Sequence, residues 1–117
     1  MTIKQLQANI EGLLLQKGFM QKMYAVKNAI QGALGEKTAI EILGYYLGAL
    51  LATEPAEYID AVKKVKGVEA ELEEAADTII RAMNIFIVNG ADAETVIRAK
   101  MEKNMDRPFM YGHGEGE

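Results

Sequence analysis

Five acidic residues lie close together at the start of the segment with the clearest helical periodicity, which runs from Glu69 to about Asn89. They are Glu69, Glu71, Glu73, Glu74 and Asp77. Glu74 and Asp77 stand three residues apart, about one helical turn, so a helix directs both carboxylates toward one point. Mg²⁺ takes oxygen ligands of this kind and fills its remaining positions with water and substrate phosphates. The same acids would also be stabilising without a ligand, because negative side chains interact favourably with a helix N-terminus.

The composition narrows the metal chemistry open to the chain. Its 117 residues contain no cysteine and one histidine, which excludes a thiolate site and any site built on two imidazoles. Asp and Glu together number 17, so a divalent ion would be held by carboxylate oxygens. The formal net charge of -4 argues against broad non-specific binding of nucleic acid.

The C-terminal segment carries the opposite charge. Lys100, Asn104 and Arg107 recur at helical spacing, and Arg98 and Lys103 lie between them or close by. Lysine and arginine neutralise polyphosphates and donate hydrogen bonds to them. Cations near a helix C-terminus are also a common stabilising feature. Residue type alone therefore leaves both interpretations open.

The spacing of apolar residues predicts an all-α domain over residues 1–104, followed by a C-terminal tail at 105–117. We expect five or six helices, at about 3–17, 20–34, 36–52, 53–66, 69–89 and 92–104. The boundary after residue 52 rests on Thr53-Glu54-Pro55, because proline is favoured in the first turn of a helix.

The segment at 42–52 is apolar on nearly every side, with Gly44 and Gly48 one turn apart. It is either a central core helix or a core helix that also forms a homodimer interface. The uncharged run at 42–53 is shorter than the ~20 residues that span a bilayer. Polar residues also interrupt any signal-peptide core at the start of the chain. We therefore expect a cytoplasmic protein that does not bind membranes.

Three segments in register resemble the MazG-like, all-α nucleoside triphosphate pyrophosphohydrolases. Residues 74–84, EAADTIIRAMN, resemble their second acidic helix, which reads E-L-A-D, an apolar pair, an arginine, and then an acid or amide. Residues 89–94, NGADAE, are similar to the family's glycine–acid loop. Residues 97–109, IRAKMEKNMDRPF, are similar to its K-M-x-x-N-x-x-R-P-aromatic ending.

The resemblance implies a helical bundle, active as a dimer or a dimer of dimers, that hydrolyses a nucleoside triphosphate to a monophosphate and pyrophosphate with Mg²⁺. Glu74 and Asp77 match the family's E-x-x-D metal ligands, which act together with an E-x-x-E pair on the preceding helix. Asn84 stands where the family often has Asp or Asn. Residues implied in phosphate and substrate contact are matched by Lys100, Asn104 and Arg107.

The sequence departs from the family at the first acidic motif. The E-x-x-E is expected on the helix at 36–52, where neither plausible register supplies a carboxylate. Glu54 and Glu57 form an E-x-x-E at the start of the next predicted helix, and they replace the missing ligands only if that helix turns toward Glu74. The chain is thus expected to be a pyrophosphohydrolase or, alternatively, an inactive helical dimer that binds nucleotides or proteins.

Overall fold

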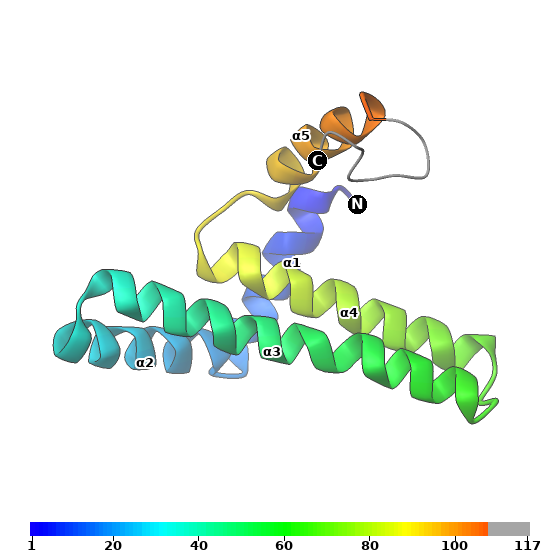
Figure 1. Cartoon of the computed structure of the whole chain (residues 1–117), viewed down its shortest axis with the longest axis horizontal. Coiled ribbons are helices and arrows are strands. Elements are labelled where there is room, and N and C mark those ends of the chain that lie inside the picture. The colour runs from blue at the N-terminus through cyan, green and yellow to red at the C-terminus, as the bar shows by residue number, and fades with distance from the viewer. Residues whose placement is uncertain (108–117) are drawn as a thin grey trace.

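The computed structural model describes residues 1–107, which form five α-helices and no β-strand. The helices are α1 (Ile3–Gln16), α2 (Phe19–Leu34), α3 (Glu36–Lys63), α4 (Val68–Val88) and α5 (Ala93–Met105). The prediction of an all-α fold is confirmed for this part of the chain. α3 and α4 form a long antiparallel hairpin, with α2 packed along the first part of α3 and α1 packed on α4 (Figure 1).

α3 continues through Pro55 as one helix of 28 residues. The predicted boundary after residue 52 is therefore wrong, and the two helices expected at 36–52 and 53–66 are one. Proline removes one backbone hydrogen bond from a helix because it has no N–H. Packing compensates for this loss, since Leu47 before the proline and Ala61 after it are both buried.

The main hydrophobic core lies where α1 meets α2, α4 and the start of α5. Its buried members are Ile10, Met20, Met83, Ile87 and Ala93. Gln7 fastens the start of α5 to α1: its Nε2 donates to the Ala91 carbonyl at 2.7 Å, and the Ala93 N–H donates to its Oε1 at 2.8 Å. α4 contributes buried apolar residues to this core only from its second half, through Met83 and Ile87. In its first half, Leu72 and Ile79 are 63% and 54% exposed.

The last part of α3 and the first part of α4 extend beyond α1 and α2 as a two-helix projection (Figure 1). We call this projection the arm and define it as residues 52–63 and 68–80. α5 lies against α1, apart from the arm. Met105, expected to begin the C-terminal tail, is the last residue of α5, and residues 108–117 of that tail lie outside the described residues. Among the described helices, none has the length and apolar character needed to cross a bilayer.

Candidate metal site

Three carboxylates converge between the two helices of the arm. Glu54 and Glu57 come from α3 and Glu74 from α4, and one oxygen from each lies within 4.8 Å of the others. We call these residues the acidic cluster. The uninterrupted α3 places the E-x-x-E pair beside the first half of α4, so the condition that this pair turn toward Glu74 is met. The cluster has the ligand number and type to hold a metal ion.

Glu54 is a buried acid on an otherwise apolar stripe of α3. It is 7% exposed, and it follows the buried Leu47 and precedes the buried Ala61 by seven residues each. Its Oε1 lies 3.7 Å from the Arg81 Nε of α4, whereas its Oε2 is buried and has no hydrogen-bond partner. A buried carboxylate is costly unless its charge and its oxygens are satisfied. Glu54 therefore contributes to the cluster a buried carboxylate that has one unsatisfied oxygen.

Glu74 is half-buried, and its Oε2 also lacks a hydrogen-bond partner. Burial raises the pKa of the Glu74 carboxyl, and the hydrogen bond with Glu57 and the negative charges of Glu57, Asp77 and Glu54 raise this pKa further. Two carboxyl groups hydrogen-bond to each other only when one carries a proton. The cluster thus needs positive charge, which a proton or a cation can provide.

Asp77 and Asn84 lie on α4 on either side of Arg81. Asp77 is exposed and is not among the three residues whose oxygens converge, although its charge acts on Glu74. Asn84 is 2% exposed, and its Oδ1 is buried without a hydrogen-bond partner. Arg81 was assigned no role in the site by sequence alone. The sequence does contain an indication of such a role, which is the spacing of Arg81. It follows Glu74 by two helical turns and therefore lies on the same face of the helix.

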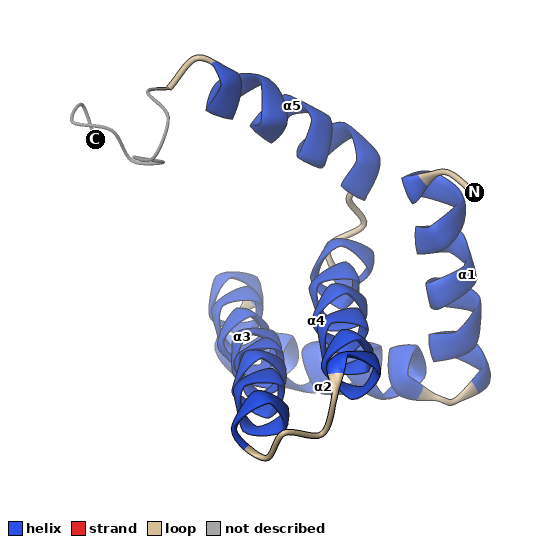
Figure 2. Ribbon diagram, turned by 90° about the vertical axis from the view of Figure 1, so that its right-hand side faces the viewer, coloured by secondary structure: helices blue, strands red, loops and turns tan. Residues whose placement is uncertain are grey.

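The predicted phosphate-binding residues are not brought to the cluster within one chain. Lys100 and Asn104 are exposed on α5, and Arg107 follows that helix. α5 lies against α1 rather than beside the arm (Figure 2). Their assignment stays a prediction.

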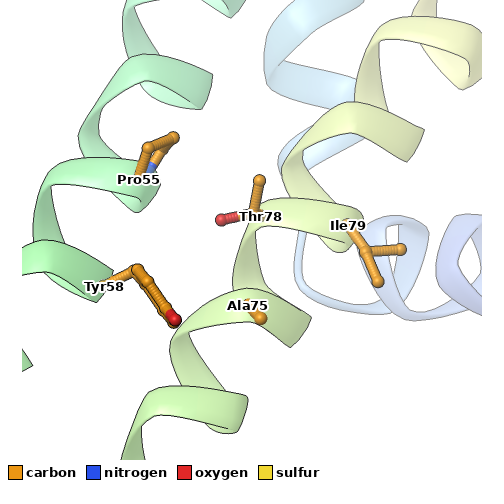
Figure 3. Close-up of a pocket in the computed structure, with 5 residues that line it drawn as sticks. All are labelled: Pro55, Tyr58, Ala75, Thr78 and Ile79. Carbon is orange, nitrogen blue, oxygen red and sulfur yellow. The ribbon is translucent and has the colours of Figure 1, made fainter. Parts of the chain in front are cut away.

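An apolar groove runs between the two helices of the arm, next to the acidic cluster. It has a volume of about 330 Å³ and is lined by Pro55, Tyr58, Ala75, Thr78 and Ile79 (Figure 3). Pro55, Tyr58, Ala75 and Thr78 each directly follow an acidic residue, so the groove lies about 100° around each helix from the acids. The Thr78 Oγ1 donates to the Glu74 carbonyl at 3.1 Å. The groove is therefore a mainly apolar surface on a different side of the hairpin.

Comparison with protein families, characterised proteins and solved structures finds no match to this chain. Membership of the MazG-like family therefore stays a prediction from the three segments that resemble it. The chemistry of the site follows from the acidic cluster and its surroundings.

The raised pKa of Glu74 predicts that the metal-free protein loses stability as the pH rises. The folded state favours the neutral carboxyl, so this stabilisation is complete below the ordinary pKa of glutamate and is lost as the pH passes the raised pKa of the folded state. Glu74→Gln is neutral at every pH and should lose less stability over this range. Urea unfolding of both proteins in EDTA, measured across the range, tests this expectation.

Other titrating groups contribute equally to the pH dependence of stability in the wild type and in Glu74→Gln. Their contributions therefore cancel when the two pH profiles are compared. Hydrogen bonding by Thr95 lowers the pKa of Asp92, so Asp92 contributes stability at higher pH that is lost on acidification. Both proteins carry this contribution. Parallel pH profiles for the wild type and Glu74→Gln would contradict the prediction.

Proposed function

We propose that this protein is a Mg²⁺-dependent nucleotide pyrophosphohydrolase that converts a nucleoside triphosphate to its monophosphate and pyrophosphate. The observation that carries the proposal is the convergence of the E-x-x-E pair on α3 with Glu74 of the E-x-x-D pair on α4. Two oxygens there, Glu54 Oε2 and Glu74 Oε2, are buried without a hydrogen-bond partner. Buried oxygens of this kind favour a resident cation.

The donor set fits Mg²⁺ in chemical type. Glu54, Glu57 and Glu74 would hold the ion, and Asp77 stands one turn from Glu74 at the exposed edge, where its carboxylate can bind the same ion or orient the attacking water. When bound, Mg²⁺ supplies positive charge that stabilises the transferring phosphorus centre and lowers the pKa of water. Asn84 lies further along α4 and is fully buried, so within one chain its Oδ1 can accept a hydrogen bond from an enclosed water but does not reach substrate.

The proposal includes a second copy of the chain. Exposed large apolar side chains outnumber buried apolar ones among residues 1–107, and several of them are on the arm. Tyr58 and Ile79 line the groove, and Ile59, Val62 and Leu72 are exposed nearby on the same two helices. We call these five residues the apolar face. The space beside Gly44 and Gly48, within the predicted interface at 36–52, is also open. A homodimer, or a tetramer made from two dimers, would cover these surfaces.

A second copy would also allow the cationic residues of α5 to contact substrate bound to the other chain. Within one chain α5 lies against α1, so Lys100, Asn104 and Arg107 would contact phosphates bound at the arm of a neighbouring copy. Their charge suits a triphosphate, which brings several negative oxygens to the site.

The proposed activity is tested with purified protein, Mg²⁺ and a panel of ribonucleoside and deoxyribonucleoside triphosphates. We expect release of pyrophosphate and a nucleoside monophosphate from at least one of them. No turnover on the whole panel would contradict the enzymatic proposal. Thermal unfolding then separates the alternative, because stabilisation by Mg²⁺ with a non-hydrolysable nucleotide indicates a binding site, whereas indifference to both favours an interaction module.

A further inference from the structure

Arg81 links the two acid-bearing helices at the edge of the cluster. It projects from α4 toward α3, and its Nε lies 3.7 Å from Glu54 Oε1. This separation is within ion-pair range but longer than an ordinary hydrogen bond of about 2.7–3.2 Å. The Arg81 side chain is 36% exposed, whereas that of Glu54 is 9% exposed. The arginine therefore reaches from solvent to a carboxylate that is almost enclosed.

The two oxygens of Glu54 are in different situations. Oε1 has the guanidinium of Arg81 beside it, and Oε2 is buried without a hydrogen-bond partner. Glu54 also belongs to the group of three carboxylates that approach within 4.8 Å. Glu54 thus has a positive charge near one oxygen and no partner at the other, which leaves the second oxygen able to bind an ion.

We propose that Arg81 is a positioning residue for the metal site, holding one oxygen of Glu54 across the hairpin so that the other is presented to the ion. This inference rests on the metal-binding part of the proposed function and not on nucleotide hydrolysis. Groups that orient metal ligands commonly affect metal affinity as strongly as some ligands do.

A cation beside a metal site has two opposing effects. It repels the incoming ion, and it keeps a ligand in the orientation that the ion needs. At Arg81 the second effect dominates, because Glu54 is buried and cannot turn outward to be solvated by water. Without the arginine, no positive group would fix the orientation of the Glu54 carboxylate. The positions of the three cluster carboxylates relative to one another would then vary.

Mn²⁺ alone is the probe, because its binding to the full-length protein can be measured by titration calorimetry without a nucleotide. Arg81→Gln should weaken Mn²⁺ binding about tenfold, near the lower end of the range for groups that orient metal ligands. Arg81→Lys keeps the positive charge and should recover part of the affinity. Circular dichroism and thermal unfolding show whether each variant keeps the helical fold.

A double-mutant cycle separates positioning from a general structural effect. In a Glu54→Gln background, Arg81→Gln should change the Mn²⁺ Kd by less than about twofold, because its target carboxylate is gone. In a Glu57→Gln background it should keep its effect of about tenfold. A loss of affinity of the same size in both backgrounds, or tighter binding by Arg81→Gln alone, would overturn the proposal.

The ion pair between Arg98 and Glu94 is the matched control. Its Nη2–Oε2 distance is 3.6 Å, but it lies on α5 and the arginine side chain is 74% exposed. Arg98→Gln should leave Mn²⁺ affinity unchanged, and a tenfold loss there would overturn the specific role of Arg81. Absence of Mn²⁺ binding by the wild type would remove the metal site and the role of Arg81 together, whereas binding without nucleotide turnover would leave both standing and refute only the hydrolase activity.

Discussion

Glu74→Gln is expected to reduce pyrophosphate release by about a thousandfold or more, whereas Glu73→Gln should leave it within about twofold of the wild type. The two acids are neighbours on α4, but they face different surroundings. Glu74 lies in the acidic cluster with one oxygen buried, and Glu73 is exposed outside that cluster. Glutamine keeps the shape of glutamate and removes its charge, so the loss reports on the ion and not on the volume of the side chain.

The measurement is the initial rate with saturating Mg²⁺ and the best nucleotide of the panel. Asp77→Ala should also abolish activity, because this acid completes the E-x-x-D pair at the exposed edge of the site. Asp60→Asn is a further control and should leave the rate unchanged, because Asp60 is an exposed acid outside the acidic cluster that pairs with Lys64 at 3.1 Å. Activity of Glu74→Gln close to that of the wild type would place the chemistry elsewhere.

The helices themselves follow from local patterns in the sequence. Thr2 caps α1, because its Oγ1 accepts from the Gln5 N–H and the Gln5 Oε1 accepts from the Thr2 N–H. Glycines at 18, 35, 67 and 90 adopt positive φ at the helix ends. The boundary predicted after residue 52 is wrong because proline locally favours the start of a helix. In the structure, packing against α4 keeps α3 continuous through Pro55. Because α3 is continuous, Glu54 and Glu57 lie on the same helix as residues 36–52, which is the helix where the family resemblance places the E-x-x-E pair.

The composition of the site could not be predicted from sequence spacing alone, because it depends on contacts between different helices. Helical periodicity directs Glu74 and Asp77 to one side of α4, but it does not show which α3 residues lie opposite them. The register between the two antiparallel helices decides that Glu54 faces Arg81 and that Glu57 reaches Glu74. The position of α5 is decided by contacts of similar range, through Gln7 and the core around Ala93.

Ile79→Lys is expected to dissociate the protein from a dimer of about 26 kDa to a monomer of 12.9 kDa. Ile79 lines the groove of the arm and is 54% exposed in the single chain, on the apolar face that a second copy would cover. An isolated pair of helices buries too little apolar surface to be stable in this exposed form. Placing a charge beside the groove opposes association, because the ammonium would have to be desolvated.

Light scattering coupled to size-exclusion chromatography measures the mass directly, and Leu15→Lys provides the control. Leu15 is 45% exposed on α1, outside both the arm and α5, so the same change in charge there should leave the dimer intact. If α5 of a second copy supplies the phosphate contacts, Ile79→Lys should lose activity together with the dimer, although the acidic cluster keeps all its residues. A monomeric wild type, or a dimer that survives Ile79→Lys, would mean that the apolar face of the arm is not the interface.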